Sequence, residues 1–243
     1  MNAALAHDFA RRASPAALPE RMDAETAYEA FRDTVASLAS VNRMTMGYRP
    51  LARFLARYAD ERGPPLRVLD VGSGYGDGVR YAARALARAG RTAEVVGVDL
   101  NPHAARAAEA VTPAYDGVTV RYVTADVFDH VETAAPYDLV VSALFTHHLE
   151  DDAVVRFLAW MDRTATRGWL INDLYRSKLA AGGFGALATL LRRHPHVRHD
   201  GPVSFARSFR REDWRVLLDE AGVTDAEVFL GAPFRLCVAK HRG

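Results

Sequence analysis

The stretch LDVGSGYGDG, residues 69–78, decides the fold of this chain. It continues a short apolar run, so Asp70 is expected at the end of a buried strand, directly before Gly72, Gly74 and Gly76. Because glycine has no β-carbon, such a turn lets a ligand lie against the backbone before the next helix begins. The stretch therefore predicts a strand, a ligand-binding turn and a helix, in that order.

The turn departs from the glycine pattern of nicotinamide dinucleotide sites. That pattern requires Gly or Ala three residues after its second glycine, where this chain has Asp77. A carboxylate there would repel a pyrophosphate, whereas Asp70 ahead of the glycines suits a ligand that carries an ammonium group. A nicotinamide dehydrogenase is therefore the weaker alternative, and a positively charged ligand is expected.

Strand-like and helix-like patterns alternate along most of the chain. Helices are expected within 25–62, and helical patterns separate five short apolar runs at 66–71, 94–99, 118–123, 137–143 and 168–173. This alternation predicts a parallel sheet covered by helices on both faces. Two further runs, 226–231 and 234–240, are expected to add an antiparallel strand pair.

With these features the sequence resembles the class I S-adenosylmethionine-dependent methyltransferases, and in particular bacterial methyltransferases of natural products. Its acidic-x-Gly-x-Gly-x-Gly signature is matched at Asp70, Gly72, Gly74 and Gly76. The resemblance implies S-adenosyl-L-methionine as cofactor. It also implies an α/β, Rossmann-like three-layer sandwich with a mostly parallel seven-stranded sheet, the last strand antiparallel, plus a helical N-terminal cover and a cap insertion.

The resemblance further implies which residues bind the cofactor. Asp99 would accept hydrogen bonds from the ribose hydroxyls, and Asp126 would accept from the adenine amino group. The rest of the implied set comprises Ser73, Leu100, Val127, Ser142 and Ala143, together with Arg43 and Tyr48 of the segment NRMTMGYRP near the methionine carboxylate. Three alternatives stay open: Asp99 caps the next helix, Asp126 is a solvated or capping residue, and the Arg43 segment merely covers the sheet.

Two adjacent histidines follow the fourth strand in ALFTHHLEDD, residues 143–152. They are expected at the carboxyl edge of the sheet, where a neutral imidazole can accept a hydroxyl proton near pH 7. Some O-methyltransferases that the sequence resembles use the first such histidine as a base, which would be His147, supported by an aspartate that would be Asp173. His148 is expected to pack or hydrogen-bond beside it. The alternative is that His147 only shapes the site.

No metal site is expected from this pair, because neighbouring side chains on a turn diverge and no cysteine or carboxylate stands at a familiar ligand spacing. Residues 174–209 interrupt the alternation and are expected to form a substrate cap with apolar walls from Phe184, Phe205 and Phe209. The alternative is a contact between two copies in a homodimer. Residues 1–24 are expected to be a mobile tail, and 25–243 a single methyltransferase domain.

Composition limits the partners. The 31 Lys and Arg residues nearly balance 30 Asp and Glu residues, so no nucleic-acid partner is expected. A single cysteine, Cys237, and the lack of a membrane-length apolar run predict a cytoplasmic protein without membrane contact. The expected reaction is O-methylation of a hydroxyl on a small aromatic or polyketide-like secondary metabolite. The alternatives are N-methylation of a heteroaromatic, C-methylation of a quinone precursor, and a non-catalytic S-adenosylmethionine-binding partner or sensor.

Overall fold

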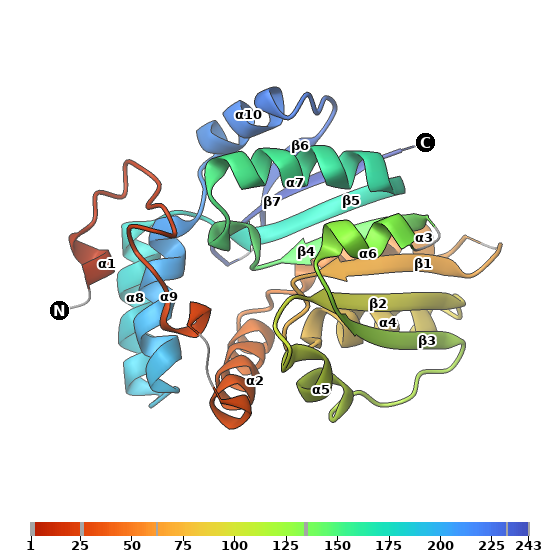
Figure 1. The fold of residues 1–243 in the computed structure, drawn as a ribbon, viewed down its shortest axis with the longest axis horizontal. Coiled ribbons are helices and arrows are strands. Elements are labelled where there is room, and N and C mark those ends of the chain that lie inside the picture. Colours follow the sequence, from red (N-terminus) through yellow and green to blue (C-terminus); the bar gives the residue numbers. More distant parts are fainter. Residues whose placement is uncertain (1–2, 25–26, 62, 134–135, 232, 243) are drawn as a thin grey trace.

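The computed structural model describes residues 3–24, 27–61, 63–133, 136–231 and 233–242. A seven-stranded sheet with the order β3-β2-β1-β4-β5-β7-β6 forms its centre (Figure 1). The strands are β1 (Leu66–Val71), β2 (Ala93–Asp99), β3 (Val118–Thr124), β4 (Tyr137–Ala143), β5 (Ala165–Leu174), β6 (Glu227–Gly231) and β7 (Arg235–His241). The β7 strand is antiparallel to both β5 and β6, and the other pairs are parallel. The seven predicted strands and the antiparallel end of the sheet are confirmed.

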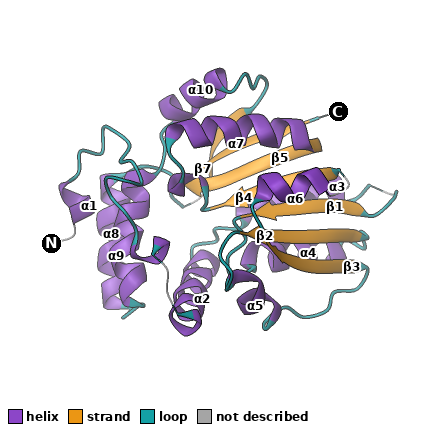
Figure 2. Ribbon diagram, viewed as in Figure 1, coloured by secondary structure: helices purple, strands orange, loops and turns teal. Residues whose placement is uncertain are grey.

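Helices cover both faces of the sheet, as Figure 2 shows. On one face, α3 (Arg49–Ala59) and α4 (Asp77–Arg88) enclose an apolar core, with α5 (Ala104–Glu109) packed along β2 and β3. On the other face, α6 (Val127–Thr133), α7 (Asp151–Thr164) and α10 (Arg211–Glu220) enclose a second core that contains Trp169 and Trp214. The sheet and its two helical layers confirm the predicted Rossmann-like sandwich.

Three longer helices lie beyond the carboxyl ends of the parallel strands. They are α2 (Tyr28–Met44), α8 (Lys178–Leu190) and α9 (Pro195–Arg207), and the last two pack side by side (Figure 1). The predicted cap segment therefore forms a helical hairpin at the edge of the sheet where ligands bind. No helix within the described residues is both long enough and apolar enough to cross a bilayer.

The N-terminal residues lie against this hairpin, although the sequence led us to expect mobility. The segment contains α1 (Ala3–Ala6) and the short 3-10 helix η1 (Arg21–Asp23). Phe9 and Ala13 are buried in a cluster with Val203 and Phe205 of α9. The backbone N–H of Ala13 donates to the carbonyl of Ala206 at 3.0 Å. These contacts join residues nearly 200 positions apart, and local sequence patterns carry no signal for them.

Candidate active site

The glycine turn between β1 and α4 has the backbone form that its sequence predicts. Gly72, Gly74 and Gly76 have φ values of 69°, 49° and 70°, in the left-handed region that favours glycine. The N–H groups of Gly72 and Ser73 donate to the carbonyl of Val98 at 2.9 and 3.2 Å, which fixes the turn against β2. A β-carbon on Gly74 would meet no atom within 4 Å. The turn thus offers open space next to the backbone.

Two carboxylates flank this turn, buried Asp70 on β1 and half-buried Asp99 on β2. Asp99 accepts from the N–H of Gly74 at 2.7 Å and from the N–H of Asn101 at 2.9 Å. Burial, and to a smaller extent the charge of Asp99, raises the pKa of Asp70 to about 7. Burial also raises the pKa of Asp99, although its backbone hydrogen bonds and nearby His148 act in the opposite direction. We call Asp70, residues 72–76 and Asp99 the cofactor cradle.

The other residues implied as cofactor contacts are differently placed. Asp126 is exposed, and its side chain accepts from the backbone N–H two residues later, so it caps α6. Leu100 is 71% exposed beside the cradle, whereas Val127 is buried in the core and Ala143 is half-buried at the end of β4. Ser142 donates its hydroxyl to a carbonyl of β1 at 3.0 Å. Its side chain therefore has a structural partner already.

Arg43 and Tyr48 lie beside the start of α4. With Arg49 and Arg80 they line a cavity of about 580 Å³. The Tyr48 hydroxyl donates to Asp77, the first residue of α4, and burial raises the pKa of this carboxyl. Asp77, the residue that breaks the dinucleotide pattern, is therefore held at a helix N-terminus, where a carboxylate is favoured. Contact of Arg43 and Tyr48 with the methionine carboxylate stays a prediction.

His147 and Asp173 lie together at the carboxyl edge of the sheet. His147 belongs to the 3-10 helix η2 (Thr146–His148), and its Nδ1 is 2.7 Å from Oδ1 of Asp173 on β5. Oδ2 of Asp173 accepts from the Thr146 hydroxyl at 2.5 Å and from the His147 N–H at 3.1 Å. Burial acts to raise the pKa of Asp173, but His147 and these hydrogen bonds hold it well below its ordinary value. The carboxylate stays charged and fixes the imidazole.

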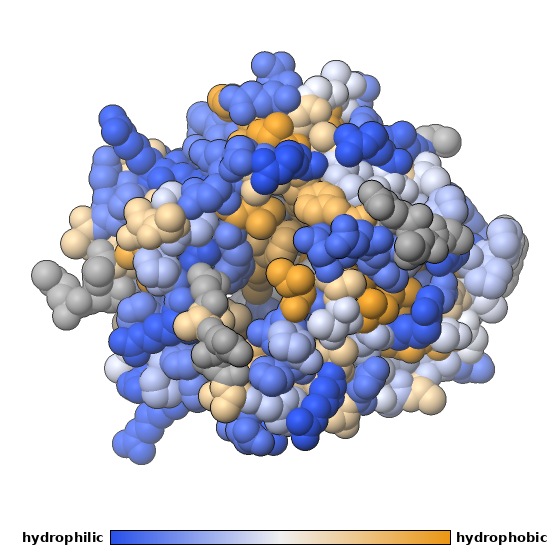
Figure 3. Space-filling model, in the orientation of Figure 1, coloured by the Kyte–Doolittle hydropathy of each residue, from blue (hydrophilic) through white to orange (hydrophobic). Residues whose placement is uncertain are grey.

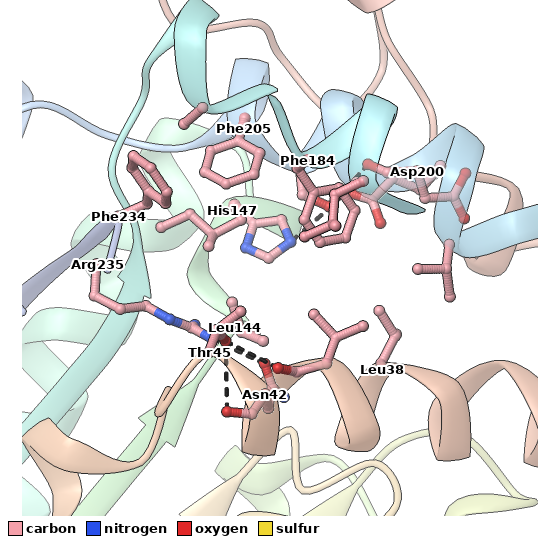
Figure 4. Close-up of a pocket in the computed structure, with 18 of the residues that line it drawn as sticks. Leu38, Asn42, Thr45, Leu144, His147, Phe184, Asp200, Phe205, Phe234 and Arg235 are labelled. Atoms are coloured by element: carbon pink, nitrogen blue, oxygen red, sulfur yellow. Dashed lines mark hydrogen bonds and ion pairs between the residues drawn. The ribbon is translucent and has the colours of Figure 1, made fainter. Parts of the chain in front are cut away.

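His147 faces a largely apolar cavity of about 330 Å³, which we call the cap cavity (Figure 4). Apolar side chains gather around a hollow between the α8–α9 hairpin and the sheet (Figure 3). The walls come from α2, α8, α9 and the start of β7, and include Leu38, Val41, Phe184, Leu187, Phe205 and Phe234. The predicted roles of Phe184 and Phe205 as walls agree with this lining. That of Phe209 is wrong, because Phe209 is fully buried in the sheet core against Trp214.

Two charged residues at the polar end of the cap cavity were missed in the sequence. Glu20 is 4% exposed, and its Oε1 accepts from the Ser204 hydroxyl at 2.8 Å. Arg207 is fully buried; its Nε donates to the carbonyl of His147 at 3.0 Å, and its Nη1 is 3.5 Å from Oε1 of Glu20. Neither residue stands in a motif. Arg207 reaches the site from the end of α9, and Glu20 reaches it because the N-terminal segment packs on α9.

Glu20, His147 and His148 offer possible metal-ligand atoms that all lie within 4.8 Å of one another. The side chains of His147 and His148 do not diverge as predicted, because their ring centroids are only 4.3 Å apart. However, the Arg207 guanidinium lies against Glu20, and its Nη2 is 3.4 Å from Nδ1 of His148. Arg207 therefore supplies the cation of this cluster, and we assign no metal to it.

Comparison with known proteins agrees with this geometry. Residues 68–168 match the family model of a methyltransferase domain. Magnesium protoporphyrin IX methyltransferase from Synechocystis, solved with S-adenosylhomocysteine, has a TM-score of 0.51 and 16% identity over 92% of this chain and 91% of that one. The plantazolicin methyltransferase BamL has a TM-score of 0.57 and 16% identity over 85% and 79%. A putative O-methyltransferase from Nostoc punctiforme has a TM-score of 0.56 and 15% identity, over 88% of this chain and 68% of that one.

No curated protein matches the sequence significantly. The match identifies residues 68–168 as a methyltransferase domain, and the strand order and the glycine turn agree with the Rossmann-like fold of the similar methyltransferase structures. The cofactor cradle fits S-adenosylmethionine, whose product S-adenosylhomocysteine is bound in the Synechocystis structure. The Asp70 carboxylate suits an ammonium group, Asp99 suits paired hydroxyls, and the open face of Gly74 admits a ligand.

Proposed function

We propose that this methyltransferase methylates a hydroxyl oxygen of a small, largely apolar acceptor bound in the cap cavity. The observation that carries the proposal is the fixed His147–Asp173 pair at a largely apolar cavity. His148 links this end to the cofactor cradle, because it lies near enough to Asp99 to oppose in part the rise in that carboxyl's pKa that burial causes. Acceptor and cofactor would therefore meet near the two histidines.

His147 has the arrangement of a general base. Asp173 accepts a hydrogen bond from Nδ1–H, so Nε2 presents its lone pair and can take the proton of an acceptor hydroxyl. When bound, S-adenosylmethionine supplies an electrophilic methyl group on a positively charged sulfur. The protein aligns the acceptor and excludes water, both of which favour an in-line displacement.

The cap cavity supports an aromatic or polyketide-like acceptor. Its volume of about 330 Å³ lies near the lower end of the range typical of small-molecule sites. Phe184, Phe205 and Phe234 come from three different elements and give flat apolar walls, as Figure 4 shows. A role in specialised metabolism agrees with the likeness to a plantazolicin methyltransferase.

Transfer of a radiolabelled methyl group to matched acceptors tests the proposal. The acceptors share one aromatic ring and carry a hydroxyl, an amine or neither, and mass spectrometry locates the label. We expect label on the hydroxyl oxygen. We also expect a fall in kcat of about 10²- to 10⁴-fold in His147→Gln, with unchanged S-adenosylhomocysteine binding and a His7→Gln control that behaves as wild type. Label on nitrogen or carbon, or a retained rate in His147→Gln, would overturn it.

A further inference from the structure

The N-terminal segment brings a second carboxylate to the imidazole that we assign as the base. Oε1 of Glu20 lies 3.6 Å from Nε2 of His147, on the opposite side of the ring from Asp173. The side chain of Glu20 is 1% exposed and that of His147 is 3% exposed. Both groups line the cap cavity. His147 is thus placed between two buried carboxylates.

Glu20 is held in this place from both sides. The backbone N–H groups of Arg21 and Met22 donate to the two carboxylate oxygens of Asp200 on α9, at 3.0 and 3.1 Å. Earlier in the segment, Arg12 donates through Nε to the carbonyl of Arg207 at 2.7 Å and through Nη2 to the carbonyl of Leu149 at 2.6 Å. These bonds fix the segment to α9 and to the residues that follow η2.

The surroundings of Glu20 set its chemical role. Ser204 donates a hydrogen bond to Oε1, and Arg207 lies against the same oxygen while donating to the carbonyl of His147. Arg207 therefore joins Glu20 to the backbone that carries the base. When Nε2 takes the acceptor's proton, the O–H bond breaks, an N–H bond forms, and the ring becomes a cation. A carboxylate at 3.6 Å favours that charged form.

We propose that Glu20 is a positioning residue for the reaction, which fixes Arg207 and stabilises the positive charge that develops on His147. The inference rests on the proposed function, because it assigns Glu20 a part in the same proton transfer. It means that the N-terminal segment completes the active site as well as the cap.

The variant Glu20→Gln tests this role. It keeps the size of the side chain and an oxygen that can accept from Ser204, but removes the charge. We expect kcat to fall 10- to 100-fold, with the KM for the acceptor and the Kd for S-adenosylhomocysteine within twofold of wild type. Glu20→Asp should recover part of the loss. Glu109→Gln, which alters an exposed glutamate on α5, is the matched control and should behave as wild type.

A second measurement does not depend on turnover. The ¹⁵N signal of His147 Nε2, assigned by its loss in His147→Gln, is expected to shift in Glu20→Gln and to stay in place in Glu109→Gln. An unchanged kcat, or a rise in KM with kcat retained, would overturn the role of Glu20. Wild-type protein that methylates no hydroxyl would instead overturn the proposed function, and the ¹⁵N signal would then still report whether Glu20 acts on His147. Binding of Zn²⁺ that is lost in Glu20→Gln would show a metal site in place of the positioning role.

Discussion

Binding of S-adenosylhomocysteine is expected to tighten as the pH rises toward 7, because of the buried carboxyl of Asp70. Burial, with a smaller contribution from Asp99, raises the pKa of this group to about 7. In more acidic solution the carboxyl is protonated and cannot pair with the ammonium group of the ligand. The ionised fraction is about 3% at pH 5.5 and about 50% at pH 7, so the apparent Kd falls about 15-fold between them.

The same carboxyl gives a pH trend to the stability of the ligand-free protein. Its pKa is raised in the folded state, so between pH 4 and 7, roughly, the native protein holds a proton that the unfolded chain has lost, and the free energy of unfolding falls as pH rises. The shift from 3.8 to about 7 amounts to at most about 4 kcal/mol at pH 8, at about 1.4 kcal/mol for each pKa unit. Asp70→Asn should therefore stabilise the ligand-free protein at pH 8 while it weakens ligand binding.

Isothermal titration calorimetry from pH 5.5 to 7.5, in two buffers with different heats of ionisation, measures both the affinity and the protons released. We expect release of about half a proton per ligand bound at pH 7, where half of the Asp70 carboxyls lose a proton on binding. Asp70→Asn should remove most of the pH dependence, whereas Asp116→Asn, at an exposed position, should keep it. A Kd that is constant over this range, or one that changes equally in Asp70→Asn, would refute the reasoning.

Substitutions at three further positions test the geometry. Asp173→Asn should lower kcat about 100-fold or more and destabilise the protein by about 1–3 kcal/mol above pH 4, as measured by denaturant unfolding, because fixed donors lose a charged acceptor. The difference should shrink in more acidic solution, because this carboxyl in the unfolded wild-type chain then takes up a proton while the native carboxylate, whose pKa is lowered, stays charged. Gly76→Ala should weaken S-adenosylhomocysteine binding in calorimetry, because its β-carbon would lie 2.4 Å from the Tyr122 hydroxyl at a φ of +70°. Gly183→Ala should raise the free energy of unfolding by about 0.5–1 kcal/mol, since this glycine lies inside α8 with open space around it. Gly183→Trp should instead fill part of the cap cavity, which Gly183 lines, and raise the KM for the acceptor without changing kcat.

The sheet could be predicted because each strand has a recognisable pattern in its own short stretch of sequence. Runs such as residues 66–71 are apolar on both faces, as a strand between two helical layers requires, and nearly every residue of β1 is buried. The meeting of His147 with Asp173 could also be anticipated, because β4 and β5 are parallel neighbours and their carboxyl ends reach the same edge. The glycine turn and Asp99 could be predicted as well, because each lies in a short motif at the end of a strand.

The cap and the N-terminal segment could not be predicted in the same way. Gly201-Pro202 is a turn signal in the sequence, yet it lies inside α9. A β-carbon on Gly201 would lie 2.0 Å from the Phe184 ring, so this glycine serves the close packing of α8 on α9. Phe209 was predicted to line the cavity but lies in the sheet core. The apolar residues of 174–209 have no regular period, so the sequence does not show which of them face the cavity and which face the core. Glu20 had no signal at all, since its partners lie on α9 and η2.

The buried charges of the two ligand sites differ, and this difference favours different ligands. The cradle holds Asp70 and Asp99, and no ion pair to either carboxylate occurs among the described residues, so it favours a cation. Near His147, the carboxylates of Glu20 and Asp173 are balanced by the buried cations Arg207 and Arg235. Asp200, which also lines the cap cavity, has partners of its own, because it accepts from two backbone N–H groups and lies 2.7 Å from Nδ1 of His199. A neutral hydroxyl adds no net charge there, whereas an ammonium or carboxylate acceptor would leave one charge uncompensated in a buried place. The distribution of charge thus favours a cationic methyl donor and a neutral acceptor, and in the proposed mechanism the imidazole that takes the proton lies between two carboxylates.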